Sequence, residues 1–199
     1  MTKPGLFEFD ILLPLSYPQS PPLVSLVTTG GGRVRFNPNL YECGKVCLSL
    51  LGTWAGPGWN ASTSTLLQVL VSIQGLILVP DPYFNEPGYE GSQGTPQGKA
   101  ASKQYSEDIR RHTLQIAILD QLKNTKSVFR DLVLRHCLLK RKKLLLQCDR
   151  SLFSSLLLTT SVFGSHVRYC LSLSLSTLLS LSLFLNLSVS LSLSQPYTM

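Results

Sequence analysis

The first part of the chain alternates between apolar and polar positions, a pattern typical of half-buried β-strands. Phe7–Ile11 alternates in this way, and prolines from Pro14 to Pro22 then end the strand. Leu23–Val27 is a second apolar run, and Arg33–Phe36 alternates again after three consecutive glycines. Because the turns between these segments are short, we expect an antiparallel β-meander.

Further along, the apolar residues recur at the spacing of an amphipathic helix. This pattern covers Leu66–Ile77, with polar residues suited to N-capping before it and Pro80 after it. A long irregular stretch, Pro82–Gly98, comes next, and two more helical patterns follow at about 99–123 and about 127–143. A set of strands followed by helices in a chain of this length predicts an α+β domain.

The composition changes sharply near residue 150. Residues 151–199 contain no Asp, Glu or Lys, and Leu alternates strictly with Ser at Leu171–Ser176. Three explanations remain open, namely a membrane anchor through residues 169–195, a strand with Leu on one face, and translation of a CT dinucleotide repeat. We therefore assign residues 1–148 to the predicted domain and residues 149–199 to a low-complexity tail that is not a folded domain.

Charge and cysteine content narrow the classes of partner and location. The formal net charge is +7, and the cluster Lys140–Lys143 supplies much of the excess. This cluster falls at the predicted end of the last helix, where cations complement the helix dipole, so we expect no nucleic-acid partner. The five cysteines have no framework spacing and no secretory signal precedes them, which predicts a reducing, cytoplasmic location with free thiols. Anchoring to a membrane is the alternative.

The segment Asn37–Leu48 contains the most informative chemistry. Cys47 follows a loop rich in Asn, Pro and Gly, where a thiol can serve as a nucleophile, although most cysteines in apolar surroundings are inert. Cys43 and Cys47 would supply only half of a metal site, and no second Cys or His pair follows at ligand spacing. We therefore expect no metal, and the residues alone leave a nucleophilic and a structural Cys47 open.

An ordered set of motifs resembles the catalytic domain of the ubiquitin-conjugating (E2) family. That family has a Tyr-Pro-x-x-Pro-Pro turn, then a His-Pro-Asn loop whose Asn lies eight residues before the active-site cysteine. The matching residues are Tyr17-Pro18-Gln19-Ser20-Pro21-Pro22, Asn37-Pro38-Asn39, Gly44-Lys45-Val46-Cys47-Leu48 and Trp59. The Asn-Pro-Asn variant, together with Pro82–Tyr89, is similar to the large E2/E3 hybrid subgroup, and the resemblance extends to about residue 148.

The resemblance implies a fold and a mechanism. The fold is a UBC-like antiparallel meander packed on helices, and this sequence lacks the first helix and first strand of that fold. The mechanism is acceptance of ubiquitin from an E1 enzyme as a thioester on Cys47, followed by transfer to a substrate lysine or an E3 ligase. By position, Asn39 matches the residue that stabilises developing negative charge, and its alternative role is to shape the loop. Glu86 aligns with the acidic residue that positions or deprotonates the lysine, and its alternative is a solvated loop acid.

The resemblance also implies the partners, which are ubiquitin, an E1 enzyme and either an E3 ligase or a substrate lysine. No cofactor is expected, because ATP is consumed in the E1 step. The family recruits E1 through the helix that has no counterpart here, so an impaired fragment acting only as a binding module is one alternative, and a tail-anchored membrane protein is another. We expect Trp59 to pack in the core, and Tyr83, Phe84 and Tyr89 to pack the long loop.

Overall fold

The computed structural model describes residues 5–147, in which the chain forms two compact units. The first unit runs to Ile118 and the second begins at Leu119. The beginning of the chain, where the resemblance implies missing elements, and the whole Leu/Ser-rich tail lie outside the described residues. The candidate chemistry belongs entirely to the first unit.

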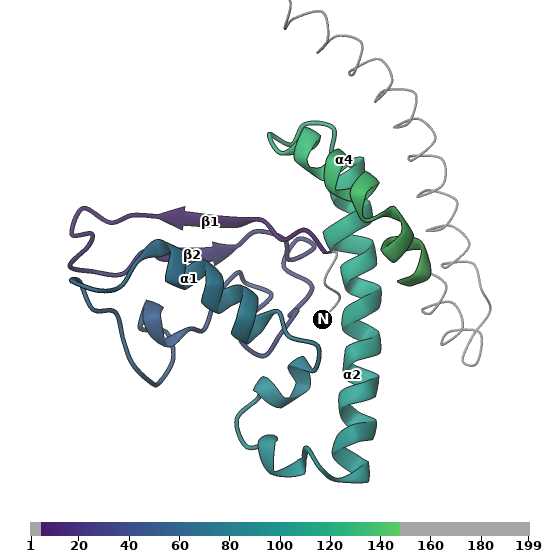
Figure 1. Cartoon of the computed structure of the whole chain (residues 1–199), viewed down its shortest axis with the longest axis horizontal. Helices are drawn as coiled ribbons and strands as arrows, with labels where there is room; N and C mark the ends of the chain where they lie inside the picture. The colour runs from purple at the N-terminus through teal and green to yellow at the C-terminus, as the bar shows by residue number, and fades with distance from the viewer. Residues whose placement is uncertain (1–4, 148–199) are drawn as a thin grey trace, which may run out of the picture. The chain divides into compact units, whose positions relative to one another are not determined.

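The first unit contains a two-stranded antiparallel sheet, made of β1 (Phe9–Leu12) and β2 (Leu23–Leu26) (Figure 1). The register pairs Phe9 with Leu26 and Leu12 with Leu23. Alternate β1 residues are half-buried and exposed, as the apolar-polar pattern predicts. On its other side β2 contacts the segment before Cys47, because the Leu26 N–H donates to the Gly44 carbonyl at 2.8 Å.

The prediction of a third strand at Arg33–Phe36 is wrong. The N–H groups of Arg33 and Val34 both donate to the Thr29 carbonyl, at 3.1 and 3.0 Å, and thus close a turn instead of a ladder. Gly30, Gly31 and Gly32 lie within this turn, and all three have positive φ, the left-handed region that glycine adopts without strain. The alternation of Arg33–Phe36 arises because Val34 and Phe36 point into the core.

The predicted helix at Leu66–Ile77 is confirmed and consists of two parts. Helix α1 (Leu66–Ser72) begins at Thr65, which forms a reciprocal capping box with Gln68. A wider π-helical turn at Ile73–Ile77 continues it. Buried Val69, Ile73 and Ile77 recur every four residues and form its inner face. Short 3-10 turns lie at Ser49–Leu51, Pro82–Asn85 and Glu90–Ser92.

The two later helical patterns also correspond to helices. Helix α2 (Pro96–Leu114) begins at Thr95, whose hydroxyl accepts from the Gly98 N–H, and contacts the 3-10 turns that precede it. A π-helical turn (Gln115–Asp120) and α3 (Gln121–Lys123) follow in the chain, and α3 belongs to the second unit. In that unit α4 (Arg130–Leu139) contacts α3, and residues 141–147 are again helical. The Lys140–Lys143 cluster follows α4 and is exposed.

A single apolar cluster supports the first unit and lies directly beneath the candidate site. It joins residues from the sheet, the Asn-Pro-Asn region, α1 and α2, so the site is attached to a rigid base. Its buried members are Leu26, Val34, Phe36, Leu40, Val46, Leu48, Leu51, Val69, Ile73, Ile77, Ile109 and Ile116.

Candidate active site

The centre of the site is the tight turn at Asn37–Asn39, which the buried Asn37 side chain holds in place. The Asn37 Oδ1 accepts from the Asn39 N–H at 2.7 Å, and its Nδ2 donates to the Ile77 carbonyl at 2.8 Å. Asn37 is fully buried, so both bonds are shielded from water. The side chain of Asn37 therefore ties this turn to Ile77, the last residue of the π-helical turn that follows α1.

A short hairpin leads from this turn to Cys47. Leu40 bridges to Val46, and the Tyr41 N–H donates to the Lys45 carbonyl at 3.0 Å. Gly44 at the bend has a φ of 89°, and a Cβ there would lie 2.9 Å from the Leu26 carbonyl oxygen. Only glycine fits this conformation and this close approach without strain. The hairpin thereby returns the chain to the Asn-Pro-Asn turn.

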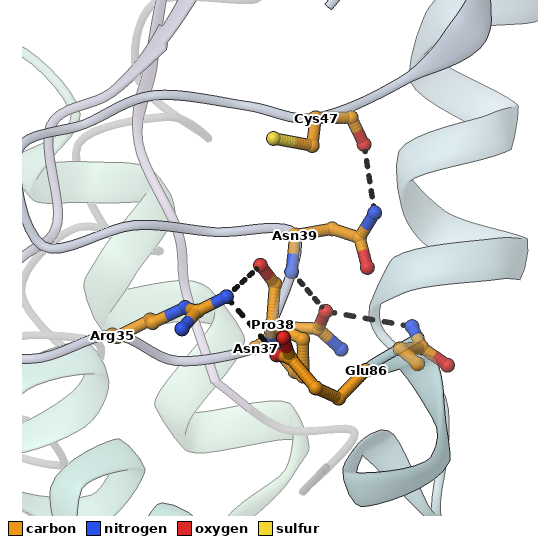
Figure 2. A network of polar contacts seen from close by, with 7 residues as sticks. Arg35, Asn37, Pro38, Asn39, Cys47 and Glu86 are labelled. Atoms are coloured by element: carbon orange, nitrogen blue, oxygen red, sulfur yellow. Dashed lines mark hydrogen bonds and ion pairs between the residues drawn. The ribbon is translucent and has the colours of Figure 1, made fainter. Parts of the chain in front are cut away.

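The structure brings two of the three predicted site residues together. The Cys47 N–H donates to the Asn39 carbonyl at 2.9 Å, and the Asn39 Nδ2 donates to the Cys47 carbonyl at 3.1 Å. Figure 2 shows the Cys47 sulfur pointing away from the Asn39 amide, which lies beside the main-chain oxygen instead. In this arrangement Asn39 fixes the backbone of Cys47, and the second N–H of its amide is available to a further acceptor.

The Cys47 thiol is buried, with 2% of the residue exposed. Burial raises the pKa of the Cys47 thiol above its ordinary value, while the positive charges of Lys45 and Arg35 act in the opposite direction. The thiolate is the nucleophilic form of cysteine, so these two cations favour the reactive state against the effect of burial.

Thr53 supports the chain on the far side of Cys47. Its hydroxyl donates to the Val46 carbonyl at 2.7 Å and accepts from the Leu48 N–H at 3.0 Å. The residues immediately before and after Cys47 are therefore anchored by one side chain. Thr53 lies six positions after Cys47, a spacing that matches no helical or strand period. Its contacts with both neighbours of Cys47 are therefore visible only in the structure.

Glu86, the third predicted site residue, reaches the site through an arginine. It follows the 3-10 turn Pro82–Asn85, and its Oε2 pairs with an outer nitrogen of Arg35 at 3.2 Å. The same Arg35 nitrogen donates to the Pro38 carbonyl at 2.6 Å, as Figure 2 shows. Arg35 thus ties Glu86 to the Asn-Pro-Asn turn, and no sequence pattern pointed to this arginine.

Aromatic side chains pack the long loop, as predicted. The Tyr83 ring lies 5.2 Å from that of Phe84, 4.7 Å from that of Tyr89 and 6.0 Å from that of Tyr105 on α2. Burial raises the pKa of Tyr105 to about 12. Trp59 is half-buried at the edge of the core, where its indole N–H donates to the Pro18 carbonyl at 2.6 Å.

Two further observations concern residues 5–147 alone. No group of three or more His, Cys, Asp or Glu side chains there is arranged to hold a metal ion. No helix in this part of the chain has the length and apolar character needed to cross a bilayer. The candidate anchor at 169–195 lies outside the described residues.

Comparisons with known proteins agree with the predicted resemblance. Residues 3–116 match the family described as Ubiquitin-conjugating enzyme. The chain is 55% identical over 148 residues to the human dual E2 ubiquitin-conjugating enzyme/E3 ubiquitin-protein ligase BIRC6. It is equally identical over 148 residues to the probable ubiquitin-conjugating enzyme protein 17 of Caenorhabditis elegans. These matches confirm the predicted family resemblance and the α+β, UBC-like fold.

The matched region is a small part of these relatives. It covers 73% of this chain but only 3% of the human protein and 20% of the nematode protein. A shorter match, 61% identical over 107 residues, relates 52% of the chain to 17% of the probable ubiquitin-conjugating enzyme E2 25 of Arabidopsis thaliana. The family match at residues 3–116 includes all three predicted site residues, Asn39, Cys47 and Glu86.

Proposed function

Since the chain belongs to the ubiquitin-conjugating enzyme family, we propose that it carries ubiquitin as a thioester on Cys47 and passes it to a substrate lysine or to an E3 ligase. The observation that carries this proposal is the position of Cys47. A hairpin delivers the cysteine to the Asn-Pro-Asn turn, where reciprocal hydrogen bonds with Asn39 hold its backbone. The human and nematode relatives are both named as ubiquitin-conjugating enzymes, which supports the same reaction class.

Two substitutions at the ubiquitin carbonyl make up the reaction. The Cys47 thiolate attacks the thioester that joins ubiquitin to E1, a new carbon–sulfur bond forms, and the E1 thiolate leaves. A lysine amine then attacks the new thioester, the Cys47 thiolate leaves, and the excess proton of the amine passes to a base. Cys47 must therefore act first as nucleophile and then as leaving group, and both roles use its thiolate.

Asn39 and Glu86 assist the second substitution in this proposal. Negative charge develops on the carbonyl oxygen as the amine adds, and the second N–H of the Asn39 amide is a suitable donor for that oxygen. The bond from Asn39 to the Cys47 carbonyl also supports the loop, so the residue serves both roles. The Glu86 carboxylate attracts the lysine and lowers the cost of losing its proton.

The proposed partners are ubiquitin, an E1 enzyme, and an E3 ligase or a substrate protein. ATP is used by E1 when it activates ubiquitin, so the chain itself needs no cofactor in this reaction. The human relative is named as both an E2 and an E3. We propose only the E2 part of that pair for this chain, because its match spans 3% of that relative.

A charging assay tests the proposal on the full chain. The protein is mixed with E1, ATP and ubiquitin and analysed on a non-reducing gel, with Cys47→Ser and Cys43→Ser beside the wild type. Cys43 is the matched control because it is an exposed cysteine on the same hairpin. We expect a reductant-sensitive ubiquitin adduct on the wild type and Cys43→Ser. A reductant-sensitive adduct of equal yield on Cys47→Ser would contradict the proposal.

A further inference from the structure

The Arg35 side chain joins the three separate segments of the candidate site. One outer nitrogen of its guanidinium donates to the Pro38 carbonyl and also pairs with Glu86. The guanidinium carbon lies 4.2 Å from the centre of the Tyr41 ring, on the hairpin that leads to Cys47. Tyr41 therefore contacts the guanidinium through a cation–π interaction. Figure 2 shows the outer nitrogen of Arg35 reaching both Pro38 and Glu86.

We propose that Arg35 is a positioning residue for lysine transfer, which fixes the Glu86 carboxylate beside the Asn-Pro-Asn turn so that it receives the incoming lysine ammonium. This inference rests on the proposed function and adds to it a residue that acts through Glu86. Arg35 itself does not touch the reacting atoms in this scheme.

The geometry around Glu86 supports an anchoring role for its carboxylate. The Oε2 atom is engaged by Arg35, and the second oxygen is the one that can accept from a lysine ammonium. Both side chains of the ion pair are 37% exposed, so an acceptor lysine can approach from solvent. The backbone of Glu86 lies in a loop after a single 3-10 turn, and the link to Arg35 adds a fixed point to that loop.

Arginine suits this role better than lysine because its guanidinium is planar and carries several donors. A planar group can lie on Tyr41 and still direct one nitrogen to two acceptors, whereas an ammonium is a compact point charge. We therefore expect Arg35→Lys to keep the charge near Cys47 but to recover only part of the positioning. Arg35→Gln removes both the charge and the ring contact.

The test separates positioning of a lysine from a general structural effect by using two acceptors. Full-length wild type, Arg35→Gln, Arg35→Lys, Glu86→Gln and the double variant Arg35→Gln/Glu86→Gln are charged with ubiquitin and then discharged. One acceptor is free lysine, and the other is hydroxylamine, an amine nucleophile that carries no positive charge at neutral pH. Arg33→Gln is the matched control, because the exposed Arg33 side chain donates to the Gly30 carbonyl of its own turn.

The expected pattern is specific to lysine. Arg35→Gln forms the thioester but discharges to lysine about tenfold more slowly, within the range measured for residues of one salt-bridge network. The double variant is no slower than the slower single variant, because Arg35 acts through Glu86. Arg35→Lys lies between wild type and Arg35→Gln, and all rates of Arg33→Gln match the wild type. Discharge of Arg35→Gln to hydroxylamine is slowed less than its discharge to lysine, because with hydroxylamine only the positive charge that favours the departing Cys47 thiolate is lost.

Several outcomes would overturn the inference. One is lysine discharge by Arg35→Gln at the wild-type rate, and another is effects of the two single variants that multiply in the double variant. Equal slowing with hydroxylamine, or failure of Arg35→Gln to form the thioester while Arg33→Gln does so, would assign Arg35 to the fold of the hairpin. A wild-type chain that forms no thioester on Cys47 would instead refute the proposed function itself.

Discussion

Asn37→Ala removes the side chain that connects the Asn-Pro-Asn turn to the π-helical turn after α1. The Asn37 amide satisfies two main-chain groups in a site with no exposed surface, the Asn39 N–H at 2.7 Å and the Ile77 carbonyl at 2.8 Å. Alanine has no polar atom to replace either bond. The substitution therefore leaves one donor and one acceptor without their partner in the interior of the first unit.

The size of the effect follows from these two groups. A buried donor or acceptor that loses its partner costs about 1–3 kcal/mol, so two of them lower the free energy of unfolding by about 2–6 kcal/mol. This is a large share of the 5–15 kcal/mol or so that is typical of a folded protein. Loss of the Asn39 bond also releases the residue that holds the Cys47 backbone, so we expect slower thioester formation in the fraction that remains folded.

Urea unfolding of the full chain, followed by circular dichroism, measures this loss. Asn85→Ala is the control, because it removes an amide whose hydrogen bonds are weaker or more exposed to solvent. The Asn85 amide lies 3.4 Å from the Asn37 Oδ1 and donates at 3.0 Å to the carbonyl of Leu76, in an exposed position. We expect the control to lose about 1 kcal/mol or less. An Asn37→Ala variant within about 0.5 kcal/mol of the wild type, the range of neutral surface changes, would refute the reasoning.

Three further predictions concern other parts of the structure. Asn39→Ala should slow lysine transfer more than thioester formation, by about 2.7–4 kcal/mol as for one oxyanion donor, and equal slowing of both steps in single-turnover assays would restrict Asn39 to shaping the loop. Thr53→Val removes the hydroxyl that bonds on both sides of Cys47 and should lower the free energy of unfolding by about 1–3 kcal/mol, whereas an unchanged urea midpoint would contradict that anchoring role. Burial raises the pKa of Cys137 from 9.0 to about 11, so above pH 9.0 the unfolded chain loses this proton first and stability should fall up to about pH 11. Urea midpoints across that window should fall less steeply for Cys137→Ala, and an identical slope would contradict the burial of this thiol.

The local patterns in the sequence predict the elements whose neighbours are close in the chain. The alternation around Phe9 and the helical spacing that includes Val69 both correspond to observed elements. Alternation fails at Arg33–Phe36, because a core-facing loop and a strand both place every second side chain inward. Three positive-φ glycines decide in favour of the loop, since they turn the chain before a ladder can form.

In the candidate site, too, one contact joins residues close in the chain and another joins residues far apart. The family resemblance pairs Asn39 with Cys47, and in the structure a short hairpin brings the two residues together. The contact between Arg35 and Glu86 spans 51 positions and depends on how the long loop folds back onto the turn. No periodic pattern encodes such a contact, and for this reason Arg35 was found only in the structure.

The most direct test of the proposed reaction isolates Cys47 from the other thiols of the chain. One full-length variant keeps Cys47 and replaces Cys43, Cys137, Cys148 and Cys170 with Ser, and its complement replaces Cys47 alone. Both are incubated with E1, ATP and ubiquitin, and their intact masses are measured before and after reductant. We expect the first variant to gain the mass of one ubiquitin and to lose it on reduction, while the complement gains no mass that reductant removes. A reductant-sensitive adduct on the complement and none on the first variant would contradict the assignment of Cys47.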